Sequence, residues 1–85
     1  SVVGVNLKAG RLWFTGFADT TLEKHVYALD LRRPGAAPRR LTTPGGWHEA
    51  EMDRAGTRLI IAASTPTQPQ QVWLADGAGK RLAWI

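Results

Sequence analysis

Short runs rich in branched aliphatic and aromatic residues recur along the chain, and turn residues separate them. The clearest are "RLWFTGF" (11–17), "KHVYALDL" (24–31), "TRLIIAAS" (57–64) and "QQVWLAD" (70–76). Such side chains suit a pleated, half-buried surface, so each run predicts a β-strand. No stretch shows a helical period with caps, and the nearest candidate, "TTLEKHVYAL", ends in Val-Tyr, which favours a strand. The pattern therefore predicts an all-β protein.

Two local features refine this prediction. Residues 59–63 are apolar at every position, which is typical of a strand covered on both faces. Short polar turns end in Gly10, Gly56 and Gly79, where we expect a positive φ that glycine adopts without strain.

The strands recur as two copies of one unit. Arg11-Leu12 and Arg58-Leu59 are 47 positions apart (58 − 11), and "VYALD" and "VWLAD" are 46 apart (72 − 26). "RRLT" and "KRLA" are 41 apart (80 − 39), because the second loop is shorter. Four-stranded units of this length are typical of β-propeller blades. We therefore expect two four-stranded antiparallel sheets that correspond to two blades, over residues 1–43 and 44–85. The expected strands are about 2–7, 11–17, 25–31 and 39–43, then 48–53, 58–64, 70–76 and 81–85.

Several segments carry a family resemblance when they are taken in order. They are Phe14-Thr15, Glu23-Lys24-His25, Val26-Tyr27, Arg40-Leu41-Thr42, Gly46-Trp47-His48 and Ser64-Thr65-Pro66. This order resembles the propeller (N-terminal) domain of dipeptidyl peptidase IV-like serine peptidases of the prolyl oligopeptidase family. The segment "MDRAG" departs from the usual family pattern and keeps a TolB-like periplasmic interaction propeller as an alternative.

The resemblance implies a role for the chain within a larger parent protein. Family members carry an eight-bladed propeller over an α/β-hydrolase domain, whose Ser-Asp-His triad removes N-terminal X-Pro or X-Ala dipeptides. The chain is then a non-catalytic fragment of the propeller that contributes to substrate access and positioning. Its partners are the remainder of the propeller, the hydrolase domain and the peptide substrate, and its location is periplasmic or secreted. The position of these two blades within the propeller and the substrate preference of the parent protein stay open.

Composition and charge limit the other function classes. The chain has 85 residues, a net charge of +4 and no cysteine, so disulfide and thiolate metal sites are excluded. The basic residues are dispersed, apart from the arginines on either side of 34–38, and we expect solvated turns rather than nucleic-acid binding. Residues 59–63 are too few to cross a bilayer, and we expect no membrane partner. A small basic all-β binding module for nucleic acid or glycan stays as a second alternative.

No residue is assigned to catalysis, to a cofactor or to a metal, and substrate-binding residues stay unknown. The only serines are Ser1 and Ser64, and neither lies in a nucleophile elbow. In a strand, Glu49, Glu51 and Asp53 share one face and His48 points away, so a hard cation is conceivable. A solvated face is the preferred interpretation.

One histidine and three tryptophans have competing interpretations. His25, near Glu23 and Tyr27, is either a proton shuttle or, as we favour, a histidine at the start of a strand with a backbone partner. We expect Trp13 and Trp73 to pack between sheets and Trp47 to be exposed.

Two blades alone leave two outer faces bare. We expect these faces to carry Leu12, Phe14, Ile60 and Trp73, and an apolar area of this kind predicts self-association of the isolated chain.

Overall fold

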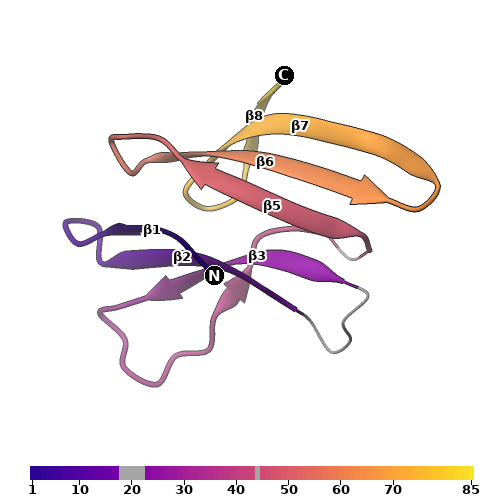
Figure 1. Cartoon of the computed structure of the whole chain (residues 1–85). Coiled ribbons are helices and arrows are strands. Elements are labelled where there is room, and N and C mark those ends of the chain that lie inside the picture. The colour runs from indigo at the N-terminus through magenta and orange to yellow at the C-terminus, as the bar shows by residue number, and fades with distance from the viewer. Residues whose placement is uncertain (18–22, 44) are drawn as a thin grey trace.

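The computed structural model describes residues 1–17, 23–43 and 45–85, and these contain eight β-strands and no helix (Figure 1). No helix in the described residues is therefore long and apolar enough to cross a membrane. The all-β prediction is confirmed. Each strand begins within two residues of its expected start, but the fourth ends at Arg40 instead of residue 43. The strands are β1 (Val2–Asn6), β2 (Arg11–Phe17), β3 (Lys24–Asp30), β4 (Arg39–Arg40), β5 (Trp47–Met52), β6 (Arg58–Thr65), β7 (Gln68–Asp76) and β8 (Arg81–Trp84).

The strands form two antiparallel meanders. In the first meander β1 pairs with β2, β2 with β3, and β3 with β4. In the second, β5 pairs with β6, β6 with β7, and β7 with β8. One parallel bridge between Lys24 and Trp47 joins β3 to β5, so hydrogen bonds connect all eight strands into one sheet.

The expected division into two separate sheets is therefore not confirmed. The physical reason lies at the outer edge of β3. The strand β4 has only two residues and pairs with Tyr27 and Ala28, which leaves the start of β3 free to pair with the start of β5.

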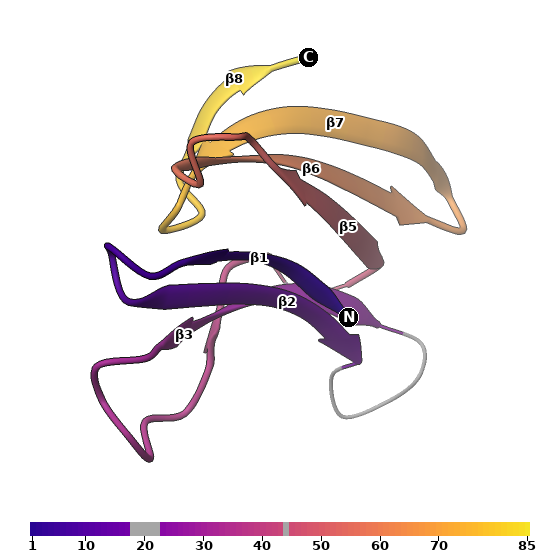
Figure 2. The same ribbon diagram turned by 60° about the vertical axis from the view of Figure 1, so that its left-hand side comes forward.

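The two meanders lie against each other as two layers, with the core between them (Figures 1 and 2). The buried side chains are Trp13 and Val26 from the first layer and Leu59, Ile61 and Ala75 from the second. Leu59 and Ile61 are two positions apart on β6 and therefore share its inner face, as the pleat requires. The predicted packing role of Trp13 is confirmed, because only 2% of this residue is exposed.

Two expectations about the outer faces need correction. Residues 59–63 are not covered on both faces, because 44% of Ile60 is exposed while Leu59 and Ile61 are buried. Among the described residues only one layer lies against β6, which leaves Ile60 exposed on the other face of the strand. Trp73 does not lie on a bare face; it packs against the core cluster. On the first layer Leu12 and Phe14 are half-buried, and Phe14 stacks on Tyr27 with ring centroids 5.3 Å apart.

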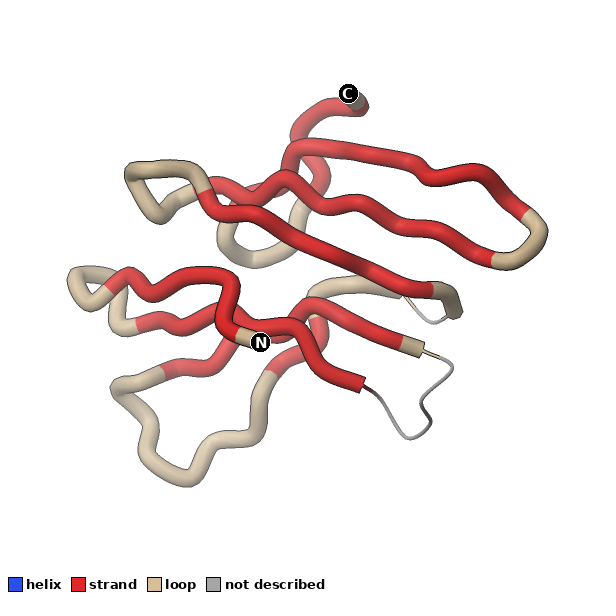
Figure 3. The backbone as a smooth tube through the Cα atoms, viewed as in Figure 1, coloured by secondary structure: helices blue, strands red, loops and turns tan. Residues whose placement is uncertain are grey.

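The turns between the strands, drawn in tan in Figure 3, confirm the glycine prediction. Gly10, Gly56 and Gly79 have φ values of 68°, 70° and 88°. An aspartate precedes the second and third of these glycines and fixes the turn. Asp53 Oδ1 accepts the backbone N–H groups of residues 57 and 58, and Asp76 Oδ1 accepts those of residues 78 and 80. The same side-chain chemistry therefore closes the turns between β5 and β6 and between β7 and β8.

Candidate functional site

Two buried histidines lie where the layers join. His25 on β3 and His48 on β5 stack with ring centroids 5.0 Å apart and ring planes inclined by 24°. Their exposed fractions are 0% and 3%. They face each other because each strand begins at the single parallel bridge. We call this pair, with its hydrogen-bond partners Glu23, Thr42 and the Lys24 carbonyl, the histidine junction.

His25 is held by side chains on both ring nitrogens. Its Nε2 lies 3.0 Å from Glu23 Oε1, and its Nδ1 lies 2.7 Å from Thr42 Oγ1. An ionised carboxylate only accepts, so Nε2 donates to Glu23; in the neutral ring Nδ1 then accepts the Thr42 hydroxyl proton. Thr42 Oγ1 in turn accepts the backbone N–H of Val26. The expected backbone partner for His25 is therefore wrong, whereas its predicted proximity to Glu23 is confirmed.

The backbone partner belongs instead to His48. Its Nδ1 donates to the carbonyl of Lys24 at 2.9 Å, which leaves Nε2 as the acceptor nitrogen of the neutral ring. Burial lowers the pKa of His48 below its ordinary value, and the positive charge that His25 can take acts in the same direction. The Lys24 carbonyl opposes this change in pKa, and Glu23 opposes it too.

Glu23 connects the junction to the loop before β5. Its Oε1 accepts the backbone N–H of Gly45 at 2.8 Å as well as the His25 ring. The Gly45 hydrogen bond, and secondly the His25 hydrogen bond, lower the pKa of Glu23. Both bonds favour an ionised Glu23, so the junction combines one carboxylate with two imidazoles. A proton shuttle at His25 has no support in this geometry, because the ring is buried and both of its nitrogens are hydrogen-bonded, to Glu23 and to Thr42.

The acidic residues of β5 do not gather into a metal site. Glu49 and Glu51 are exposed while His48 is buried, which confirms the predicted alternation along the strand. Glu49 pairs with Lys24 across the layers. The Asp53 carboxylate accepts hydrogen bonds within its own turn. The backbone N–H group of Thr57, and secondly that of Arg58, lowers the pKa of Asp53. Across residues 1–17, 23–43 and 45–85 no three His, Asp or Glu side chains are placed to share a metal ion.

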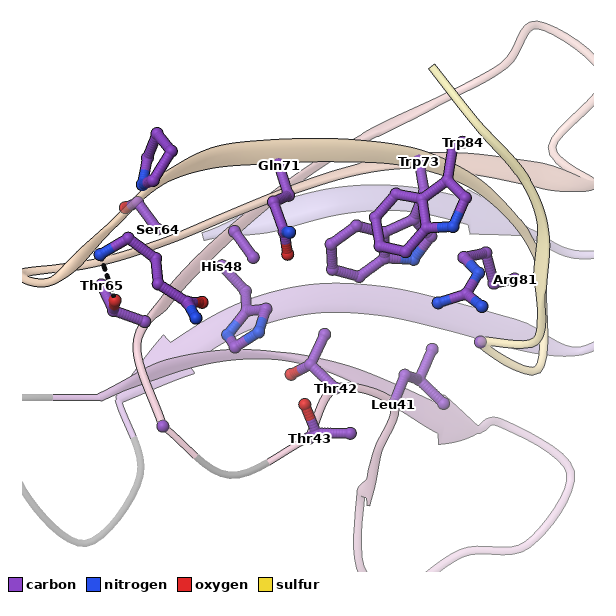
Figure 4. Close-up of a pocket in the computed structure, with 15 residues that line it drawn as sticks. Leu41, Thr42, Thr43, His48, Ser64, Thr65, Gln71, Trp73, Arg81 and Trp84 are labelled. Atoms are coloured by element: carbon purple, nitrogen blue, oxygen red, sulfur yellow. Dashed lines mark hydrogen bonds between the residues drawn. The ribbon is translucent and has the colours of Figure 1, made fainter.

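A pocket of about 420 Å³ opens beside the histidine junction (Figure 4). Leu41, Thr42 and Thr43 of the first meander form one side, and residues of β6, β7 and β8 form the other. His48 borders the same space.

The upper wall of the pocket is aromatic. Trp73 on β7 and Trp84 on β8 are partners in the strand register and meet edge to face, with centroids 5.7 Å apart. The Arg81 guanidinium lies 4.3 Å from the centroid of the Trp84 ring. Sequence reasoning missed Trp84, Gln71 and Arg81. The only signal in the sequence was the recurrence of tryptophan in the last two predicted strands.

A second pocket, of about 250 Å³, is lined by residues of β2 and β3 and of the turn between β7 and β8. Arg11, Arg33 and Arg39 line it together with Asp30. Arg33 and Arg39 are exposed residues on either side of the 34–38 loop, as the interpretation of solvated turns predicts. Trp47 is exposed too, at 42%, which confirms its prediction.

The family model described as the dipeptidyl peptidase IV (DPP IV) N-terminal region matches residues 1–70. The chain belongs to this family. The predicted resemblance is thereby confirmed, and membership of the DPP IV N-terminal family indicates a dipeptidyl peptidase, a hydrolase, as the parent protein.

The family match does not extend over the whole pocket. The matched residues include the first meander, β5, β6 and the first residues of β7, and thus the entire histidine junction. Gln71, Trp73, Arg81 and Trp84 lie beyond residue 70. Ser64 also borders the pocket, but no hydrogen bond of the described residues joins a serine to a histidine.

Proposed function

We propose that this chain forms two consecutive blades of the propeller of a DPP IV-like serine peptidase and that it takes no part in the chemical step. The first blade spans residues 1–43 and the second spans 44–85. The observation that supports this assignment is the repetition of one four-stranded antiparallel meander within a chain matched to the family over residues 1–70. Propeller blades are built from such four-stranded units.

The outer faces of the meanders support a place between other blades. Ile60 is exposed on the second layer, and the Phe14–Tyr27 stack lies on the side of the first layer that faces away from the core. A blade normally covers such residues by packing against the next blade. The remainder of the propeller and the hydrolase domain are therefore the partners that we propose. The TolB-like propeller has no observation in its favour beyond the shared strand pattern.

We further propose that the two blades form part of the wall around the substrate chamber. A rigid wall excludes folded proteins and positions an unfolded peptide terminus, while a triad in the hydrolase domain removes the X-Pro or X-Ala dipeptide. Family membership supports a periplasmic or secreted location, which we also give as a proposal. The chain itself then contributes no catalytic residue and needs no cofactor.

The test uses the complete product of the reading frame that contains this segment. We expect it to hydrolyse glycyl-prolyl-p-nitroanilide and to lose this activity with a serine-directed inhibitor. The variant Trp13→Ala removes a buried side chain between the layers. Such a deletion costs about 3–5 kcal/mol and loosens the wall. Cleavage of a folded protein with a Gly-Pro terminus should then rise relative to cleavage of the small substrate.

The matched control is Leu7→Ala, because Leu7 is exposed in a turn. It should leave the ratio of the two activities unchanged. A complete product without X-Pro hydrolysis would reject the peptidase parent. An unchanged ratio in a Trp13→Ala protein with a lowered melting temperature would reject the role of these blades in access.

A further inference from the structure

We propose that the pocket between the two meanders is a binding site for a short, uncharged or acidic saccharide, which contacts the indole rings of Trp73 and Trp84 and is hydrogen-bonded by Gln71 and Arg81. This inference is independent of the peptidase assignment, because the four side chains that it assigns to the ligand lie beyond the residues matched to the family.

The size and composition of the pocket suit a small ligand. Its volume of about 420 Å³ lies within the range of known ligand pockets. Figure 4 shows the Gln71 side chain directed into the space between the two layers, with Trp73 and Trp84 beside it. Aromatic walls with a few polar groups that converge on one space are the usual makeup of a binding site.

The indole rings offer flat apolar surfaces that are held in place. Trp73 is half-buried against the core, and Trp84 is 55% exposed. The edge-to-face contact between the two rings and the Arg81 guanidinium over Trp84 limit the rotation of the exposed ring. The C–H groups of a pyranose ring pack against such surfaces without loss of their hydroxyl hydrogen bonds. A rigid aromatic pair therefore reduces the entropy cost of binding a sugar.

The polar groups of this wall are the hydrogen-bonding atoms that it offers to a ligand. Within the part of the chain that the structure describes, no hydrogen bond is made by the Gln71 amide, the Arg81 guanidinium or the indole N–H groups of Trp73 and Trp84. Trp13 is different, because its indole N–H donates to the Gly77 carbonyl at 2.9 Å. Amide and guanidinium groups present two hydrogen-bonding atoms in one plane, which matches a pair of neighbouring sugar hydroxyls.

The charged side chains of the pocket determine which saccharides it accepts and whether it can hydrolyse them. Among the described residues that line the pocket there is no aspartate or glutamate, and Arg81 and His48 are the only ionisable side chains. A cationic sugar is therefore disfavoured, whereas a neutral sugar or a uronic acid is accepted. Glycoside hydrolysis by the usual route needs two carboxyl groups beside the bond that breaks. The described lining of the pocket has neither, so we expect it to bind a saccharide without cleaving it.

The experiment follows the indole N–H signals of the 15N-labelled chain by NMR. The four tryptophans give four such signals, which are assigned with Trp→Phe variants. The probes are chitotriose, maltotriose and trigalacturonate, each added up to about 10 mM, where a Kd near 1 mM saturates. We expect at least one probe to move the signals of Trp73 and Trp84 saturably and to leave that of Trp13 in place.

A pair of adjacent glutamines provides the matched control. Gln71 lines the pocket, and Gln70 precedes it on β7 with its side chain on the opposite face of the strand. Gln71→Leu keeps the bulk and removes the hydrogen bonds, so the Kd for the bound probe should rise roughly tenfold. Gln70→Leu should leave the Kd unchanged.

Three results would overturn the proposal. One is the absence of saturable shifts at Trp73 and Trp84 with all three saccharides. Another is a response of these signals to the peptide acetyl-Ala-Pro-Ala-amide but to no saccharide, which would assign the pocket to peptides. The third is movement of the same signals when the protein is diluted without a probe, which would show that a second copy of the chain occupies the pocket. None of them affects the peptidase test above, which measures hydrolysis by the complete product.

Discussion

A contact between the two meanders offers the sharpest test of how the layers pack. Trp13 lies on β2 of the first meander, and Gly77 lies in the turn between β7 and β8 of the second. The Trp13 indole N–H donates to the Gly77 carbonyl at 2.9 Å. A Cβ atom added at Gly77 would lie 3.0 Å from Cζ2 of the same ring. A methyl group at Gly77 therefore competes directly with the indole for space.

The expected free energies follow from this contact. In Gly77→Ala the added methyl overpacks the site, which costs about 1–3 kcal/mol of unfolding free energy. Because Gly77 has no positive φ, the backbone itself accepts alanine. In Trp13→Phe the Gly77 carbonyl loses its donor, and we expect a loss of about 1–3 kcal/mol from that group alone. The smaller ring leaves room for the methyl in the double variant. Gly77→Ala should then cost close to nothing, and the coupling energy should be about 1–3 kcal/mol in favour of the double variant.

The assay is urea unfolding of the four proteins, followed by far-UV circular dichroism at one protein concentration. Light scattering checks that all four have the same molar mass, and equal slopes in urea show that they expose the same surface on unfolding. Gly16→Ala is the matched control, since its added Cβ would meet its nearest atom, Phe14 Cε2, at an ordinary 3.8 Å. It should show no coupling with Trp13→Phe. If Gly77→Ala and Trp13→Phe are additive within about 0.5 kcal/mol, the layers do not pack as described.

Three further predictions concern pH, the loop before β5 and the bare faces. The pKa of His48 is lower in the folded chain than in the unfolded chain, so as the pH falls the unfolded chain takes up a proton on this ring first. The contribution of His48 to stability is therefore full above about pH 6.5 and is lost as the pH falls from there through the folded-state pKa. His48→Asn should flatten this loss in thermal unfolding between about pH 7 and pH 5. Gly46→Ala places a Cβ 2.6 Å from the Ser64 carbonyl oxygen at a φ of 80°, so it should lower the melting temperature well beyond Gly35→Ala, where φ is 85° and the added Cβ meets nothing within 4 Å. The isolated chain should form dimers or larger assemblies in a light-scattering concentration series, and Ile60→Lys should weaken them.

Each of these predictions has an outcome that contradicts it. An unaltered pH profile in His48→Asn would mean that the histidine does not titrate differently in the folded chain. Equal melting temperatures for Gly46→Ala and Gly35→Ala would mean that the Gly46 backbone does not approach β6. A rigid monomer down to low concentration would mean that the two layers bury enough surface by themselves, which would count against their assignment as excised blades.

The strands and turns were predictable because their causes are local. Alternation along a strand depends on residues two positions apart, and a positive φ depends on one residue, as at Gly56 and Gly79. The burial of residues 59–63 could not be predicted in this way. An apolar run shows that both faces are suited to burial, but whether a partner covers the side that bears Ile60 depends on chain that lies elsewhere.

The candidate site was less accessible to sequence reasoning, because contacts between distant positions create it. Thr42 meets His25 across 17 positions, and nothing in either local pattern connects a threonine in a loop with a histidine on a strand. Trp73 and Trp84 face each other because a register shift between Leu74 and Ala75 sets the pairing of β7 with β8. Composition alone indicated many tryptophans but not which of them share a wall.

One departure from the repeat accounts for both parts of the site. The strand β4 has two residues, whereas its counterpart β8 has four. Because β4 is short, β3 pairs with β5 at Lys24, and that pairing brings His25 against His48. For the same reason, no Cα atom in the strands of the first meander approaches within 8 Å of one in β7 or β8. The chain after β4 is irregular, and it passes the inner side of β7 and β8. The inner side of β7 and β8 is thus lined by loop residues such as Leu41 instead of a fourth strand, and the pocket is the space that remains. The repeat thus predicts the arrangement of the strands. The pocket lies where the two copies of the repeat differ, and there the side chains of Trp73 and Trp84 are left accessible to a ligand.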